Sequence, residues 1–244
     1  MIFLITEIDI ETPEKTKLMD VSTNYTLVKK KEHTYYEVKH KLYFVIKRIF
    51  DIICSIIGIM ALIPIAFVTK ICYLLTGDTK SIFYTQKRIG KNGKDIYIYK
   101  LRSMVYNADE VLVNLLENED YKKEWEKNQK FENDPRITKI GKIIRKTSID
   151  EMPQFINVLI GDMSCIGPRP LVEGELDAHN GDHSIYESVK PGISGWWAAN
   201  GRSATDYNKR LELEYFYCDN CSISLDLKCI FKTIKAVVCK TGAR

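Results

Sequence analysis

The order of apolar and polar residues along the 244-residue chain divides it into three parts. Residues 1–40 are polar, contain the charged run Lys29–Glu32 and show no sustained period, so we predict an extension with little regular structure. Residues 41–76 surround the uncharged apolar stretch Ile52–Val68, whose 17 residues are near the lower limit for crossing a bilayer. Residues 77–244 combine short apolar runs with turn residues, and we predict that they fold as one domain.

The apolar stretch contains Pro64, which removes one backbone hydrogen bond, so we predict a kink or break in the helix at this residue. Basic residues mark the cytoplasmic side of a membrane helix, and here they flank both ends of the stretch. They are Lys41, Lys47 and Arg48 before it and Lys70, Lys80, Lys87 and Arg88 after it. A reentrant helix–break–helix over residues 41–76, which enters and leaves on the same face, satisfies both flanks. The alternative is the buried core helix of a soluble protein.

The remaining pattern predicts a small β-hairpin among helices. Ser81–Gln86 and Asp95–Lys100 have the composition of strands and flank a turn that contains Asn92 and Gly93. Further helices are predicted at residues 105–130, 205–218 and 222–240. The last has apolar residues opposite lysines, so it either lies on an anionic membrane or packs against the domain. We therefore expect a mainly helical α+β protein with a reentrant membrane helix, amphipathic interfacial helices and a small β-hairpin.

Composition and charge narrow the possible partners. Hydrophobic residues make up 45% of the chain, which is enough for a core. The seven cysteines show no disulfide framework, so a reducing compartment is expected. The net charge is only +4, but seven Lys and Arg residues lie between Lys80 and Arg102 against one acid, Asp95. Such a patch suits an anionic partner, which can be lipid headgroups, a phosphorylated substrate or nucleic acid.

The candidate chemistry lies in a pair of adjacent carboxylates, Asp150 and Glu151. The basic pair Arg145 and Lys146 precedes them, and Arg169 follows between two prolines. Carboxylates supply a nucleophile or base, and the planar fork of arginine matches phosphate oxygens. Ser148 and Glu151 also match a capping box, which predicts that the pair lies in the first turn of a helix, where anions are favoured.

A second carboxylate pair, Asp109 and Glu110, begins a strongly charged helix and has no adjacent arginine or rigid loop. It is most simply a solvated helix start. We therefore assign the chemistry to Asp150 and Glu151.

Three separated runs of the sequence carry a family resemblance. In order they are FYTQKRIGKNGKDIYIYKLRSM, DPRITKIGKIIRKTSIDEMPQFINVLIGDMSCIGPRP and VKPGISGWWAANGR. They resemble the bacterial sugar transferase family in its compact form, and the likeness extends from about Phe44 to the C-terminus. Members are monotopic phosphoglycosyl transferases on the cytoplasmic face of the bacterial inner membrane. They move a sugar 1-phosphate from a nucleotide sugar, usually a UDP-sugar, to a polyprenyl phosphate such as undecaprenyl phosphate and release nucleoside monophosphate. This is the first membrane step of capsule, exopolysaccharide or other glycan synthesis.

The resemblance implies a role for each candidate residue. Asp150 would attack the β-phosphorus to form a covalent aspartyl-phosphosugar, and Glu151 would orient or deprotonate. Mg²⁺, bound through Asp150, would neutralise the diphosphate. The implied phosphate and nucleotide-sugar contacts are Lys100, Arg102, Arg145, Arg169 and Arg202. Pro64 corresponds to the break in the family's membrane helix.

The chain also departs from the family pattern. Trp197-Ala198-Ala199 stands where Trp-Gln-Val is usual, and Glu214 stands where aspartate is common. Two rival functions are less consistent with the sequence. An ordinary glycosyltransferase would show an Asp-x-Asp motif, and no two aspartates here lie two apart. A membrane-tethered module that binds anionic lipid without catalysis would leave the carboxylate pair and the Gly167–Pro170 turn without a role. We expect a nucleotide sugar, a polyprenyl phosphate and the membrane as partners, and no nucleic acid.

Overall fold

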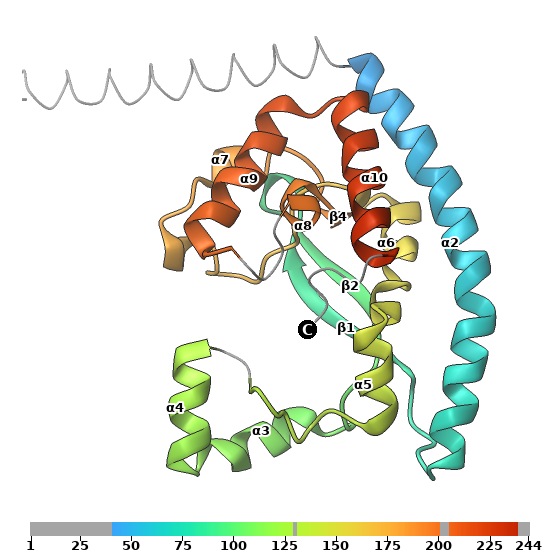
Figure 1. Cartoon of the computed structure of the whole chain (residues 1–244), viewed down its shortest axis with the longest axis vertical. Coiled ribbons are helices and arrows are strands. Elements are labelled where there is room, and N and C mark those ends of the chain that lie inside the picture. Colours follow the sequence, from blue (N-terminus) through green and yellow to red (C-terminus); the bar gives the residue numbers. More distant parts are fainter. Residues whose placement is uncertain (1–40, 129–130, 201–204, 239–244) are drawn as a thin grey trace, which may run out of the picture. The chain divides into compact units, whose positions relative to one another are not determined.

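The computed structural model describes residues 41–128, 131–200 and 205–238 (Figure 1). The chain divides into two units, Met1–Ile46 and Lys47–Arg244. The contacts and sites described below all lie within the second unit. The extension predicted at residues 1–40 lies outside the described residues.

The described chain is mainly helical and contains two small sheets. The α-helices are α2 (Lys41–Leu75), α3 (Ala108–Leu116), α4 (Glu119–Asn128), α5 (Lys139–Lys146), α6 (Gln154–Ile160), α7 (His183–Tyr186), α8 (Trp196–Asn200), α9 (Tyr207–Asn220) and α10 (Ile223–Val238). The strands are β1 (Phe83–Ile89), β2 (Asp95–Leu101), β3 (Ser164–Ile166) and β4 (Gly192–Ser194), and the short 3-10 helices are η1 (Lys91–Gly93), η2 (Ile149–Glu151) and η3 (Asp177–His179). The predicted mainly helical α+β class is confirmed.

Strands β1 and β2 form the predicted hairpin. They are antiparallel, with Phe83 opposite Leu101 and Ile89 opposite Asp95. At the turn, Asn92 has φ 60° and Gly93 has φ 72°, and both values lie in the left-handed region that asparagine and glycine tolerate best. The second sheet pairs β3 with β4 in parallel and brings the Gly167–Pro170 turn beside residues 192–195. That sheet was not predicted, because each of its strands has only three residues.

Helix α2 differs from the prediction at Pro64. It is one continuous α-helix of 35 residues with Pro64 inside it, and Figure 1 shows it as an unbroken ribbon. A break of the helix at Pro64 is therefore wrong, while a kink there stays a prediction. Proline removes one hydrogen bond, and the bonds of the neighbouring turns on both sides remain to hold a helix of this length. Whether α2 returns to the same face of a membrane stays a prediction.

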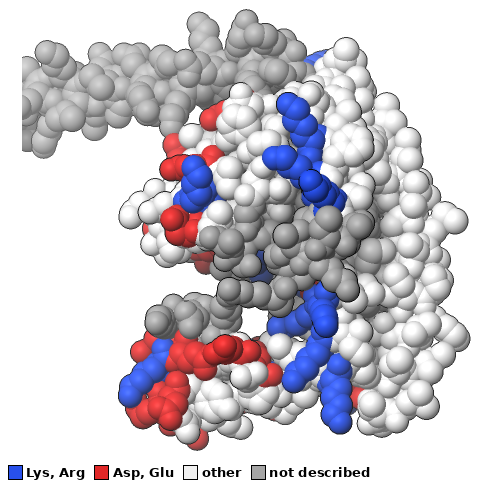
Figure 2. Space-filling model, viewed as in Figure 1, with Lys and Arg blue, Asp and Glu red and all other residues white. Residues whose placement is uncertain are grey.

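The two sides of α2 differ in character. One side exposes apolar residues, including Ile57, Met60, Ile63 and Phe67, each more than 60% exposed. Among the described residues, α2 is the one helix long and apolar enough to cross a membrane. Figure 2 shows few charged side chains along this helix. The exposed apolar side argues against the alternative of a soluble core helix, which would be covered by protein.

The other side of α2 is attached to the rest of the unit by polar contacts. Arg48 donates to the carbonyl oxygens of Val158 and Leu159 in α6, at 2.6 and 2.7 Å. The buried Asp51 accepts a hydrogen bond of 2.9 Å from the backbone N–H of Cys165 in β3. Buried polar groups need such partners, so these contacts fix how α2 lies against α6 and β3.

Helices α3 and α4 replace the single charged helix predicted at residues 105–130. The side chain of Asn118 accepts a hydrogen bond of 2.9 Å from the N–H of Asp120, which starts a second helix. Acidic side chains gather over these two helices in Figure 2, and basic ones gather over the neighbouring α5. The exposed acids are Asp109, Glu110, Glu117, Glu119, Asp120 and Glu126. The second carboxylate pair thus lies on a solvated helix start, as predicted.

Helix α10 bears on the two alternatives raised for residues 222–240. Its apolar residues Leu227, Phe231 and Ile234 are 46%, 69% and 55% exposed, while Leu225 and Cys229 are buried. One side of α10 therefore packs against the domain, and the apolar side with Leu227, Phe231 and Ile234 is exposed. This favours an interfacial helix over ordinary internal packing.

Candidate active site

A cavity of about 660 Å³ lies between β2, η2, the Gly167–Pro170 turn, α8 and α9. Its size falls in the range of ordinary ligand sites. The charged residues that line it are Arg88, Lys100, Glu151, Arg169 and Glu214, and further lining residues include Ser148, Gln154, Ser194, Gly195, Trp197 and Thr233. The cavity thus combines three basic side chains with two carboxyl groups.

The carboxylate pair lies in η2, which is a single 3-10 turn ahead of α6. The predicted capping box is wrong, because Ser148 adopts the left-handed conformation (φ 55°) and its side chain makes no capping hydrogen bond. The pair is nevertheless held at the start of a helical segment. Glu151 lines the cavity, whereas the half-buried Asp150 beside it is not among the lining residues.

The electrostatics show that the predicted residues come together. Burial, and then the neighbouring charge of Glu151, raise the pKa of Asp150, while Lys100 and Arg145 act in the opposite direction. Burial lowers the pKa of Lys100, and the charges of Glu151 and Asp150 oppose that change. Lys100 also feels the positive charges of Arg169 and Arg88. The two carboxyl groups and the basic residues therefore act on one another.

Asn157 of α6 fixes the carboxylate pair relative to β2. Its fully buried side-chain amide donates to the carbonyl oxygen of Tyr97 at 2.7 Å and accepts from the N–H of Tyr99 at 2.9 Å. In this way the backbone N–H and carbonyl groups at the free edge of β2 find hydrogen-bond partners in a side chain. Lys100 directly follows Tyr99 in β2, and Glu151 ends η2 just two residues short of the start of α6, so the same contact sets their spacing.

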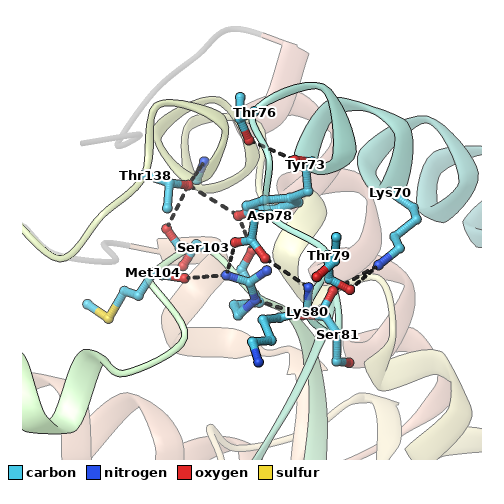
Figure 3. A network of polar contacts seen from close by, with 12 residues as sticks. Lys70, Tyr73, Thr76, Asp78, Thr79, Lys80, Ser81, Ser103, Met104 and Thr138 are labelled. Atoms are coloured by element: carbon cyan, nitrogen blue, oxygen red, sulfur yellow. Dashed lines mark hydrogen bonds and ion pairs between the residues drawn. The ribbon is translucent and has the colours of Figure 1, made fainter.

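Arg145 and Arg102 take different positions. Arg145, in the last turn of α5, donates from Nε to Ser103 Oγ at 2.8 Å and is exposed. Arg102 is buried, pairs with Asp78 at 2.9 Å and donates to the carbonyl oxygen of Ser81 at 2.7 Å, and Figure 3 labels both of these partners. Arg102 does not line the cavity, so its position gives no support to phosphate binding. In a strand, every second side chain points to the same face, which would place Arg102 beside Lys100. Strand β2 ends at Leu101, so this alternation does not extend to Arg102.

The remaining predicted residues are also separated. Arg169 lines the cavity, and its backbone N–H donates to Glu214 Oε1 at 3.1 Å. Arg202 lies outside the described residues. Pro64 lies within α2 and does not line the cavity. The structure thus brings Lys100, Asp150, Glu151, Arg145 and Arg169 together and places Arg102 and Pro64 elsewhere.

Comparison with known proteins decides the family. The model of the bacterial sugar transferase family matches residues 42–240. The chain belongs to the bacterial sugar transferase family. An undecaprenyl-phosphate galactose phosphotransferase of Salmonella typhimurium is 44% identical over 199 residues, which are 81% of this chain and 41% of the relative. The exopolysaccharide production protein ExoY of Sinorhizobium fredii is 38% identical over 198 residues, which are 81% of this chain and 87% of the relative.

Relatives in this sugar transferase family differ in length. The chain matches less than half of the Salmonella protein and 43% of a UDP-galactose-lipid carrier transferase of Erwinia amylovora, to which it is 39% identical. It matches most of ExoY. The matched region contains the cavity and all the candidate residues described above.

Two residues of this family member were not predicted as site residues. Arg88 and Glu214 both line the cavity. The Nε atom of Arg88 and the Oε2 atom of Glu214 are buried, and neither has a hydrogen-bond partner in the described chain. Arg88 belongs to the basic patch noted in the sequence, and Glu214 was noted only as a departure from aspartate. Neither stands next to the carboxylate pair in the sequence, so spacing alone did not connect them to it.

Asp150 and Glu151 fit a divalent cation that is also bound by phosphate oxygens of the substrate. Within the described ranges there is no group of three or more His, Cys, Asp or Glu side chains that could hold a metal ion. Mg²⁺ is typically bound by one or two carboxylates together with phosphate oxygens, so Asp150 and Glu151 suffice as protein ligands. Burial is the main cause of the raised pKa of Asp150 and the charge of Glu151 is the second, and a cation would relieve that second contribution.

Proposed function

We propose that this protein transfers a sugar 1-phosphate from a nucleotide sugar, most simply a UDP-sugar, to undecaprenyl or another polyprenyl phosphate. The single observation that carries the proposal is the cavity in which Glu151, beside Asp150, faces Lys100, Arg88 and Arg169. Basic side chains bind a diphosphate, and a carboxylate beside them supplies a nucleophile. The names of the relatives, which include galactose and N-acetylgalactosamine phosphotransferases acting on undecaprenyl phosphate, support the same reaction.

The reaction divides into two displacements at one phosphorus. A carboxylate oxygen of Asp150 attacks the β-phosphorus of the donor, and the bond from that phosphorus to the bridging oxygen breaks. Nucleoside monophosphate leaves with the electron pair and the sugar phosphate stays on Asp150 as an acyl phosphate. An oxygen of the polyprenyl phosphate then attacks the same phosphorus and displaces the Asp150 carboxylate. The product is a polyprenyl diphosphate sugar.

The chain's own residues supply positioning and charge. Lys100 and Arg169 hold the diphosphate oxygens, with Arg88 from β1 as a third cation in the cavity. Arg145 lies on the Asp150 side and counters the charge of that carboxylate. Glu151 faces the cavity and orients or deprotonates. Mg²⁺, held by Asp150 with Glu151 beside it, would neutralise the charge of the diphosphate.

The acceptor's long apolar chain calls for a membrane, and the exposed apolar faces of α2 and α10 supply surfaces for one. We propose that the protein sits on the cytoplasmic face of the bacterial inner membrane, with α2 inserted, and acts early in capsule or exopolysaccharide synthesis. Cysteine-accessibility labelling at Thr79 and at Tyr43 tests the reentrant topology. Labelling of the two positions from opposite faces would contradict it.

The proposed function is tested by a donor screen with purified protein and polyprenyl phosphate in detergent. We expect release of nucleoside monophosphate, and not of nucleoside diphosphate, with at least one nucleotide sugar. A donor labelled in its β-phosphate should leave label on the protein that hydroxylamine removes, on the peptide that contains Asp150. Release of nucleoside diphosphate, or no turnover with any donor, would reject the proposal.

A further inference from the structure

Glu214 is a buried carboxyl group with one unused oxygen. It lies in α9 and is 1% exposed. Its Oε1 accepts the hydrogen bond from the Arg169 N–H at 3.1 Å, whereas Oε2 has no hydrogen-bond partner in the part of the chain that the structure describes. Leaving a buried polar atom unpaired costs free energy, and native structures rarely do so without a reason. The lining of the cavity includes Glu214, so Oε2 is available to a ligand.

The unused oxygen is not compensated by an ion pair among the described residues. Arg210, one turn earlier in α9, pairs instead with Glu175 at 3.2 Å. Burial raises the pKa of Glu214 to about 7, while Arg169 and Arg210 act against this rise. Near neutral pH the carboxyl group can therefore both accept and donate a hydrogen bond.

Glu214 and Glu151 line the same cavity, but the charges that act on Glu214 differ from those that act on the carboxylate pair. The charges that act on Glu214 are those of Arg169 and Arg210. Those that act on Asp150 include Glu151, Lys100 and Arg145. Arg169 acts on both Lys100 and Glu214, so it is the basic residue that the two surroundings share.

The cavity that Glu214 lines also contains neutral polar and aromatic groups. Ser194 and Thr233 share a hydrogen bond of 2.8 Å between their hydroxyl oxygens, and Trp197 and Ala198 lie in the same lining. Gly195 adds no side chain, and a Cβ atom there would lie 3.8 Å from Glu214 Oε2 and clash with the Gly167 carbonyl oxygen. Such a lining suits a neutral polar ligand group, since the Glu214 carboxylate would repel a phosphate placed against its Oε2.

Of the two proposed substrates, only the nucleotide sugar carries hydroxyl groups, because a polyprenyl phosphate consists of hydrocarbon and phosphate. We infer that Glu214 binds a hydroxyl group of the donor and thereby selects which nucleotide sugar is used. This inference rests on the proposed function. The hydroxyl belongs either to the transferred sugar or to the ribose, and a carboxylate is suited to both.

The test compares donors that lack one hydroxyl each. The best donor from the screen is compared with its deoxy analogues at each sugar position and with its 2′-deoxyribose form, by nucleoside monophosphate release. The wild type is expected to lose at least a hundredfold in kcat/KM with one of these analogues, since a site built for a hydroxyl rejects donors without it. We call the loss in kcat/KM with each analogue its penalty. In Glu214→Met the penalty for that one analogue should fall to less than threefold, while the penalties for the other analogues should stay as in the wild type.

Two further variants separate binding from folding. Glu214→Gln can keep the bond to the Arg169 N–H through its carbonyl oxygen, and it should reduce the same penalty at least tenfold even if Glu214→Met does not fold. Tyr186→Phe removes a 2.9 Å hydrogen bond to the Arg169 carbonyl oxygen but presents nothing to the cavity. It should leave every penalty as in the wild type.

The outcomes are distinct. Loss of a penalty at a sugar position assigns Glu214 to the transferred sugar, and loss at the ribose assigns it to the nucleotide. An active wild type whose penalties all persist in Glu214→Gln and Glu214→Met overturns this inference and leaves the proposed function intact. A wild type that releases no nucleoside monophosphate from any donor rejects both.

Discussion

Arg102, at the end of β2, and Asp78, just after α2, form an ion pair of 2.9 Å that joins the apolar helix to the hairpin that carries Lys100. The guanidinium is 6% exposed and lies 4.5 Å from the centre of the Tyr73 ring. The Tyr73 hydroxyl in turn donates to the Arg102 carbonyl oxygen at 2.7 Å and contacts Thr138 at the start of α5 (Figure 3). One buried network thus holds α2, β2 and α5 together.

Removing one partner of this ion pair should destabilise the protein. Asp78→Asn leaves the buried guanidinium of Arg102 without its counter-charge, so we expect a loss of about 3 kcal/mol in the free energy of unfolding. Chemical denaturation in detergent micelles measures it. Glu173→Gln is the matched control, because it breaks the exposed pair with Lys87 (3.1 Å) and should cost less than about 1 kcal/mol. Equal effects of the two variants would contradict the role of the network.

The two carboxylate pairs should differ sharply in their effect on turnover. Asp150→Asn keeps the size of the side chain but removes the proposed nucleophile, so turnover should fall roughly ten-thousand-fold or more. Asp109→Asn changes an exposed helix start and should leave turnover within a factor of two and stability within about 0.5 kcal/mol. Nucleoside monophosphate release measures both. A fully active Asp150→Asn protein would show that the nucleophile lies elsewhere.

Removal of divalent cations should abolish turnover. The carboxylates and the donor diphosphate repel one another, and Lys100, Arg88 and Arg169 offset only part of that repulsion. Excess EDTA should stop nucleoside monophosphate release, and added Mg²⁺ should restore it. Unchanged turnover in EDTA would show that these three basic side chains are sufficient by themselves.

Burial of Glu214 should make stability depend on pH. Its pKa is about 7 in the folded protein against 4.5 for the free group, so its neutral form stabilises the fold fully below pH 4.5. That contribution is lost as the pH rises through about 7, and it amounts to about 3 kcal/mol. Between pH 4.5 and 8, Glu214→Gln should therefore gain about 3 kcal/mol relative to the wild type in thermal or chemical unfolding. A constant difference across this range would show that Glu214 keeps an ordinary pKa.

The exposed side of α2 should carry membrane binding. Met60 is 67% exposed, and an acid placed at the centre of a membrane helix costs roughly 2.5–3.5 kcal/mol of insertion. Met60→Glu should therefore reduce co-flotation with vesicles of anionic phospholipid. Val113→Glu is the control, because Val113 is 64% exposed on α3, in the acidic part of the surface. If the two variants bound vesicles equally, α2 would not be the membrane contact.

The sequence by itself determined the local features of this protein. Asn92 and Gly93 specified the hairpin turn because few residues tolerate positive φ, and the uncharged run Ile52–Val68 specified a long apolar helix. The adjacent Asp150 and Glu151 with nearby basic residues identified the chemistry, because nucleophile and phosphate contacts came from one short segment. These features depend on residues close together in the chain.

Only the tertiary structure decided which distant residues share the cavity. Arg102 looked equivalent to Lys100 two residues earlier, but β2 ends between them and a buried partner, Asp78, takes the guanidinium. Glu214 lies 45 residues after Arg169 and reaches its backbone N–H only because α9 packs there. The continuity of α2 through Pro64 was likewise invisible, since a proline's effect depends on the bonds that surrounding turns retain. Burial and long-range contacts set these outcomes, and neither is written in local spacing.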